Sequence, residues 1–183
     1  MSGQGADKSL PAPLVVTALL PESLQSRADQ LRQAHFPPER NFLKAHVTLF
    51  HALPPSCEAE LRAVLAGLAR EHAPVPAYLT GVMKLGRGTA LGIESEDMLA
   101  LWDRLADRFH GLLTPQDEHR PRLHVTIQNK VSLEEAKALQ TELGPRILPR
   151  EFAFRGFGLF AYRGGPWEPL RDFAFRGQAR VDD

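Results

Sequence analysis

The sequence predicts an α+β fold made of two pseudo-symmetric α/β lobes, with antiparallel sheets around a central cleft. Segments typical of strands alternate with segments typical of helices along most of the 183 residues, and two short turns have the composition of β-hairpins. Two six-residue segments, 45–50 and 123–128, are near copies, and their histidines His46 and His124 are 78 positions apart. The order strand, helix, loop, strand, helix, hairpin therefore occurs twice along the chain.

The first half opens with a short apolar and β-branched segment, typical of a strand covered on both faces. Pro21 indicates a helix start, because its fixed φ suits the first helical turn. Gly86 and Gly88 indicate a hairpin turn between two later strands. The expected elements are a strand at 14–20, a helix at 21–35, a loop at 36–41, a strand at 44–53, a helix ending near residue 72, and strands at 78–85 and 89–94.

The second half repeats this order after Ser95. Its first helix is indicated by apolar residues three or four apart, from Met98 to Leu112, and Trp102 on this stripe is 78 positions beyond Leu24 on the first helix. Ser132 and Glu135 have the spacing of a capping box. The expected elements are a helix along that stripe, a loop at 114–121, the second motif strand, a helix from 132 to 143, and strands at 152–162 and 167–175 joined by a turn at 163–166.

Composition limits the class of protein. With 43% hydrophobic residues, the chain can bury a core without staples, and we expect one bilobed domain at 13–176 between flexible segments at 1–12 and 177–183. Lys+Arg and Asp+Glu balance at 22 each, which argues against a global basic field for long nucleic acids. A single cysteine and the lack of a signal peptide or a membrane-length apolar run favour a soluble, cytoplasmic monomer.

The two near copies place the same chemistry on two strands. Because side chains alternate between the faces of a strand, His46 and Thr48 project to one side, and His124 and Thr126 do the same in the second copy. Two imidazoles across a cleft form an acid–base pair at neutral pH, and the hydroxyls can donate to phosphate oxygens. This combination favours transesterification or hydrolysis of a phosphodiester, with no metal and no cofactor.

Three other interpretations of these residues remain open. The histidines can be ordinary strand residues, with threonines beside them for β-propensity, although two matched copies weigh against this. A metal site is disfavoured because His46 and His51 point to opposite faces of a strand and no acidic residues have ligand-like spacing. A cysteine nucleophile would have to be Cys57, which follows a double proline, and no serine elbow motif is present.

The paired segments His46-Val-Thr-Leu49 and His124-Val-Thr-Ile127 resemble the signature of the 2H phosphoesterase superfamily. This superfamily includes the bacterial proteins called 2′-5′ RNA ligases and the cyclic nucleotide phosphodiesterases. The resemblance extends from about residue 13 to 176 and implies two lobes around a cleft and cleavage or formation of 2′-linked phosphodiesters without metal. It also implies that His46 and His124 are the acid–base pair and that Thr48 and Thr126 hold the phosphate.

The sequence departs from the pattern of the RNA-ligase-type members five positions beyond each histidine. Those members commonly have an aromatic residue and an arginine there, whereas this chain has His51 and Asn129. By strand parity, Phe50 shares the face of His46, and Gln128 and Lys130 share the face of His124. The candidate substrate contacts are Phe50, Gln128, Lys130 and, at a hairpin turn, Arg163. A core aromatic is an equally good interpretation of Phe50, and a solvated side chain is the alternative for Arg163.

The leading hypothesis is a metal-independent phosphoesterase for a 2′,3′-cyclic phosphate or a 2′-5′ linkage of a nucleotide or short RNA end. Hydrolysis to a 2′-phosphate is the favoured version. The alternatives are a binding module for a nucleotide or RNA end that lacks the chemistry, and a cyclic phosphodiesterase for a non-RNA sugar nucleotide.

Overall fold

The computed structural model describes residues 11–179. The helices in this part of the chain are α1 (Glu22–His35), α2 (Glu58–Glu71), α3 (Glu96–Arg108) and α4 (Leu133–Leu143). The strands are β1 (Leu14–Leu19), β2 (Val47–Leu53), β3 (Val75–Lys84), β4 (Thr89–Glu94), β5 (His124–Gln128), β6 (Arg150–Phe154), β7 (Gly156–Tyr162) and β8 (Trp167–Ala174). Short 3₁₀ turns lie at Pro38–Arg40, Pro55–Cys57, Pro115–Glu118 and Gly144–Arg146.

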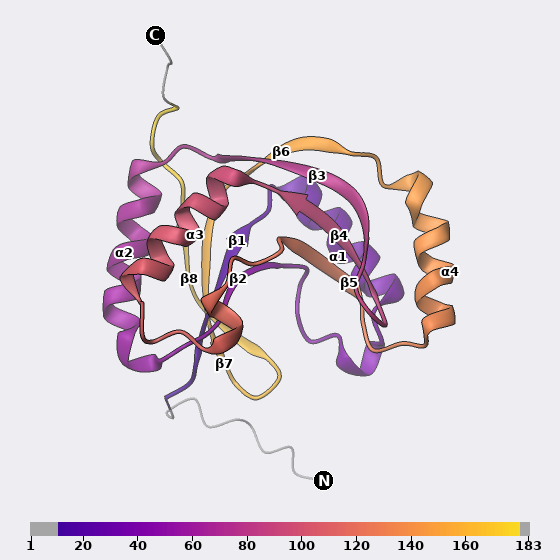
Figure 1. Cartoon of the computed structure of the whole chain (residues 1–183), viewed down its shortest axis with the longest axis horizontal. Helices are drawn as coiled ribbons and strands as arrows, with labels where there is room; N and C mark the ends of the chain where they lie inside the picture. The colour runs from indigo at the N-terminus through magenta and orange to yellow at the C-terminus, as the bar shows by residue number, and fades with distance from the viewer. Residues whose placement is uncertain (1–10, 180–183) are drawn as a thin grey trace.

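The strands form two four-stranded antiparallel sheets, with the orders β2-β1-β7-β8 and β5-β4-β3-β6. The motif strands β2 and β5 occupy matching edges, and each pairs with the strand that precedes it in the chain. These two edge strands meet near the middle of the molecule (Figure 1). The predicted α+β fold with two related lobes and antiparallel sheets is therefore confirmed.

The lobes do not coincide with the two halves of the sequence. The predicted strand at 152–162 is wrong as a single element, because the chain changes sheets at Arg155: β6 pairs with β3, whereas β7 pairs with β1. The Arg155 amide and its Nε donate to the carbonyls of Leu19 and Leu20. Next to it, a Cβ on Gly156 would lie 2.2 Å from the Phe173 carbonyl oxygen, so the crossing needs glycine.

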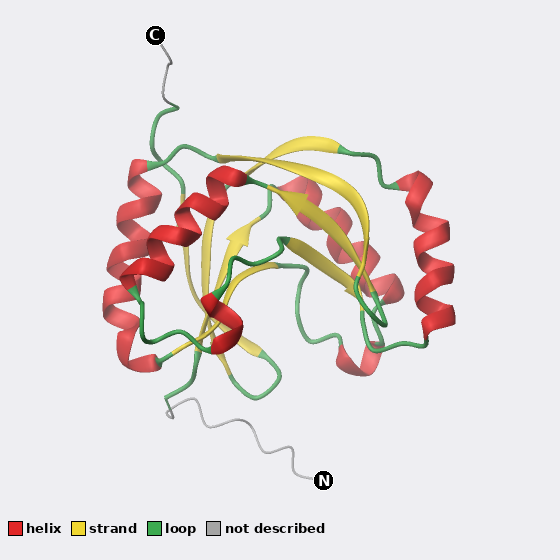
Figure 2. Cartoon of the chain, in the orientation of Figure 1, coloured by secondary structure: helices red, strands yellow, loops and turns green. Residues whose placement is uncertain are grey.

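Helices flank the two sheets, and two of them also tie the lobes together (Figure 2). Ion pairs between Arg104 and Glu71 and between Arg108 and Glu60 join α3 to α2, while α4 lies at the opposite flank (Figure 1). Helix α1, which follows β1 of the first sheet, packs against β5 of the second. Helix α3 packs against β3 of the second sheet. Its Trp102 Nε1 donates a hydrogen bond to the Leu49 carbonyl of β2, in the first sheet, at 3.0 Å.

Local signals in the sequence account for most element ends. The capping box is confirmed: Ser132 Oγ accepts from the Glu135 amide, and Glu135 Oε2 accepts from the Ser132 amide. The stripe of α3 is shorter than predicted, because the helix ends at Arg108 and Gly111 has φ +86°. Leu112 is therefore 44% exposed.

The expected flexible segments fall mostly outside the described residues, which exclude 1–10 and 180–183. Gly177 of the expected tail is held, because its amide donates to the His72 carbonyl at 3.0 Å. Among residues 11–179, no helix is long and apolar enough to cross a membrane.

Candidate active site

Both His-x-Thr segments open onto one cavity of about 440 Å³. His46 lies just before β2 begins, Thr48 is on β2, and His124 and Thr126 are on β5. All four side chains line the cavity, together with Leu49, His51, Gln116, Asp117, His119, Arg120, Pro121, Arg122 and Trp167. Residues 78 positions apart are therefore brought to facing walls of one cleft.

The backbone fixes the two motif imidazoles in the same way. His46 Nδ1 lies 2.8 Å from the Lys44 carbonyl oxygen, and His124 Nδ1 lies 2.6 Å from the Arg122 carbonyl oxygen. Because a carbonyl can only accept, each Nδ1 must carry the hydrogen. Each Nε2 is then the ring nitrogen left to meet a ligand, and both imidazoles can take or give a proton there.

His46 is the more enclosed of the two. The Trp167 ring packs against it, with ring centroids 4.5 Å apart and planes at 52°. Burial lowers the pKa of His46 from 6.5 to about 4, and the positive charges of Arg32, His124 and His51 act in the same direction against the hydrogen bond to Lys44. The His46 imidazole is therefore neutral at pH 7.

A β-bulge follows the threonine in both motif strands. On β2, Thr48 pairs with Thr17 but Phe50 pairs with Val16, so Leu49 is the extra residue. On β5, Thr126 pairs with Ala90 and Gln128 with Thr89, so Ile127 is the extra residue. A bulge residue reverses the alternation of side chains beyond it, and the parity argument for Phe50 and Gln128 is wrong for this reason.

The bulges turn both of those side chains into the core. Phe50 is 1% exposed and stacks on Trp102, with centroids 5.4 Å apart. Gln128 is 6% exposed, and its Oε1 accepts a hydrogen bond from the Thr89 hydroxyl at 2.9 Å. Neither residue lines the cleft.

The two predicted cationic contacts also lie away from the cleft walls. Lys130 is exposed beyond the end of β5 with φ 56°. Arg163 is in the turn between β7 and β8, where its Nε donates to Glu168 Oε2 at 3.0 Å. Neither is among the residues that line the 440 Å³ cavity.

Sequence reasoning missed Asp117 and Trp167 as cleft residues. Asp117 lies in the polar 3₁₀ turn before β5, and its buried carboxylate accepts hydrogen bonds from the amides of His51 and Ala52 and contacts His51 Nδ1 at 2.9 Å. Trp167 begins β8, more than 100 residues from His46. His51, which departs from the family pattern, follows the first motif directly on the same strand and also lines the cleft.

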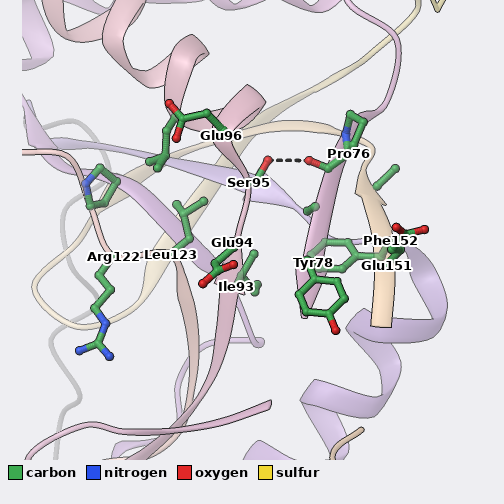
Figure 3. Close-up of a pocket in the computed structure, with 14 residues that line it drawn as sticks. Pro76, Tyr78, Ile93, Glu94, Ser95, Glu96, Arg122, Leu123, Glu151 and Phe152 are labelled. Carbon is green, nitrogen blue, oxygen red and sulfur yellow. Dashed lines mark hydrogen bonds between the residues drawn. The ribbon is translucent and has the colours of Figure 1, made fainter. Parts of the chain in front are cut away.

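A larger cavity of about 750 Å³ lies on the other side of Arg122, between α3 and strands β3, β4 and β6. Figure 3 shows its polar groups, which include the carboxylates of Glu94 and Glu151 and the Ser95 hydroxyl bonded to the Pro76 carbonyl. Ser95 also caps α3. Carboxylates on its walls disfavour a phosphate, and neither His-x-Thr segment lines this larger cavity.

The cysteine-nucleophile and metal-site interpretations are not supported by the arrangement of side chains in the described part of the chain. Cys57 is buried, its Sγ donates to the Pro54 carbonyl, and burial raises the pKa of its thiol. Within residues 11–179, no group of three His, Cys, Asp or Glu side chains is arranged to hold a metal ion.

Two lobes that carry paired His-x-Thr segments to one cleft define the class of 2H phosphoesterases. In agreement, residues 20–166 match the family model described as the 2′-5′ RNA ligase superfamily. The chain belongs to this superfamily, whose members are enzymes of the phosphoesterase type. No curated protein sequence matches it.

Solved structures show the same fold. The protein TT0787 of Thermus thermophilus superposes with a TM-score of 0.60 at 20% identity, over 91% of this chain and 100% of that one. Escherichia coli LigT complexed with NADP+ gives 0.55 at 20% identity, over 91% and 99%. The same protein complexed with 3′-AMP gives 0.51 at 20% identity, over 91% and 99%.

Proposed function

We propose that this protein is a metal-independent phosphoesterase that opens a 2′,3′-cyclic phosphate, or cleaves a 2′-5′ linkage, of a nucleotide or RNA end. The observation that carries the proposal is that two imidazoles, each with Nδ1 fixed on a backbone carbonyl so that Nε2 is left for a ligand, line one cavity together with Thr48 and Thr126. In-line displacement at phosphorus needs a base on one side and an acid on the other. The reciprocal arrangement of the two edge strands supplies both.

The difference between the two imidazoles suggests their roles. His46 is neutral at pH 7, since its pKa is lowered to about 4, so its Nε2 accepts the proton of the attacking water. The water oxygen bonds to phosphorus while the bond from phosphorus to O3′ breaks. His124, in its protonated form, donates its proton to O3′ and leaves a 2′-phosphate. Thr48 and Thr126 donate to the non-bridging oxygens, where negative charge increases in the transition state.

Nucleotide chemistry is supported by solved structures with the same fold. Escherichia coli LigT is known in complexes with NADP+ and with 3′-AMP. A cleft of about 440 Å³ is within the range that takes one small ligand. A nucleotide or the last residue of an RNA is therefore the substrate class that we propose.

The test is turnover of the four nucleoside 2′,3′-cyclic phosphates in EDTA by the wild type, His46→Ala and His124→Ala. Each substitution should lower kcat by about 10²-fold or more, the scale of a lost general acid or base. His72→Ala is the matched control, because its Nδ1 also contacts a backbone carbonyl, Leu68 O at 2.8 Å, but it is outside the cleft. Ligand binding without turnover would identify a binding module instead, and activity that EDTA abolishes would contradict the metal-independent mechanism.

A further inference from the structure

The cleft contains two imidazoles that the two-histidine chemistry does not use, those of His51 and His119. His51 lies three residues beyond Thr48 on β2 and lines the same cavity, and 43% of its side chain is exposed. Its Nδ1 contacts Asp117 Oδ1 at 2.9 Å. The motif histidines bond through Nδ1 to neutral carbonyls, so His51 is the one cleft imidazole in residues 11–179 that is held by a carboxylate.

Asp117 is built to stay ionised. Its side chain is 1% exposed, and burial alone would raise the pKa of its carboxyl. Hydrogen bonds from the His51 ring and from the amides of Ala52 and His51 outweigh this and hold the pKa below its usual value. The contact of Nδ1 with this carboxylate fixes the orientation of the His51 ring and leaves Nε2 as the ring nitrogen that can meet a ligand.

Satisfying Asp117 does not require the ring. Asp117 Oδ2 already accepts from the amides of His51 at 2.8 Å and Ala52 at 3.0 Å. Those two bonds already satisfy the amides of His51 and Ala52 on the free edge of β2. The His51 ring adds a further contact to Asp117, but it also lies exposed on the cleft wall. A ring with a purely structural role would not need to be exposed there.

The charges around His51 favour an anion. The cavity that His51 lines is also lined by His119, Arg120 and Arg122, and Asp117 is the one carboxylate that lines it among the described residues. Arg120 is shared between Asp103 and Glu96. No ion pair or side-chain hydrogen bond holds Arg122 within residues 11–179.

Position along the strand separates this anion from the reacting phosphate. A strand rises by about 3.3 Å per residue, and His51 is three residues beyond Thr48, so we expect the two side chains to meet different parts of a bound ligand. We propose that His51, positioned by Asp117, binds a second phosphate of the substrate, so that the cleft prefers nucleotides with a phosphate next to the one that reacts. This inference rests on the proposed function and names its substrate more narrowly.

The second phosphate has two chemical sources, a 5′-terminal phosphomonoester or the internucleotide diester of an RNA end. The test compares kcat/KM for adenosine 2′,3′-cyclic phosphate, for the same nucleotide with a 5′-phosphate, and for a dinucleotide that ends in the cyclic phosphate. The wild type should prefer one or both of the last two substrates by about 10-fold or more, the scale of one charge-assisted hydrogen bond. Which of them is preferred identifies the source.

His51→Gln should reduce that preference ratio to near one, and Asp117→Asn should give an intermediate ratio. The ratio cancels any general loss of activity, so a merely structural role would leave it unchanged. His110→Ala, an exposed histidine outside the cleft, is the control. Equal kcat/KM for all three substrates, or a preference that survives His51→Gln, would overturn the inference alone, whereas no turnover of any of them by the wild type would overturn the proposed function.

Discussion

Arg32 is the side chain whose removal tests how the two lobes are held together. It is 4% exposed on α1, and it donates from Nε to Asn41 Oδ1 at 2.9 Å and to the Leu43 carbonyl at 3.0 Å. A further hydrogen bond of 2.9 Å joins Nη1 to the Thr126 carbonyl in the second motif strand. The guanidinium also lies 3.9 Å from the ring centroid of Phe36. One buried side chain thus connects the loop before His46 to β5 of the other lobe.

Replacing Arg32 by methionine keeps most of the volume but removes every donor. A hydrogen bond to a charged group contributes about 1.5–3 kcal/mol, and buried carbonyls left without a donor add a cost. Allowing for the favourable desolvation that the substitution brings, we expect the free energy of unfolding to fall by about 3–5 kcal/mol. With a urea m-value of about 2 kcal/mol/M, the midpoint of unfolding should fall by about 2 M.

Urea unfolding followed by circular dichroism measures this change. Arg27→Met is the matched control on the same helix, because Arg27 is exposed and donates to one carbonyl, that of Arg146. We expect this control to change the free energy of unfolding by less than about 0.5 kcal/mol. If Arg32→Met stays within about 1 kcal/mol of the wild type, the lobes do not depend on this side chain and the reasoning is refuted.

Three further measurements test single contacts. Between pH 6.5 and about 4, His46 binds more protons in the unfolded chain than in the folded chain, so the free energy of unfolding should fall by up to about 2 kcal/mol from pH 7 to 5. His46→Gln should show a shallower fall, and an unchanged dependence on pH would contradict the lowered pKa. Trp102→Phe keeps an aromatic ring against Phe50 but loses the hydrogen bond to Leu49 and part of the buried indole, so the free energy of unfolding measured in urea should fall by about 2 kcal/mol or more; a value near zero would contradict this. Ser132→Ala should lower the thermal midpoint by the equivalent of about 1 kcal/mol through loss of the capping box, whereas Ser26→Ala on the exposed face of α1 should not.

The paired motifs could be predicted from the sequence because the spacing of His46 and Thr48 alone sets their common face. What lies beyond each threonine could not be predicted in this way. Whether Leu49 pairs regularly or becomes a bulge residue depends on its register against β1, and Ile127 depends likewise on β4. A pattern of alternating residues contains no information on that register, so strand parity cannot place Phe50, which is in the core.

The other differences have the same origin in long-range pairing. The run from 152 to 162 looks like one strand because its residues are apolar or aromatic throughout, except at Arg155. Its division follows from partners more than 70 residues away, β3 for one part and β1 for the other. Asp117 is likewise recognisable only once the 3₁₀ turn that carries it lies against the end of β2.

The return of β7 to the first sheet determines when the cleft can exist. Strand β1 is an inner strand that pairs with β2 on one side and with β7 on the other. The pairing with β7 runs from Gly156 to Ala161. Trp167, which covers His46, comes later still. A nascent chain that ends near residue 155 would contain both His-x-Thr segments but would lack the strand that completes the first sheet. Long-range pairing of this kind folds slowly, and the cleft that holds both His-x-Thr segments is complete only after β7 and Trp167 have been made.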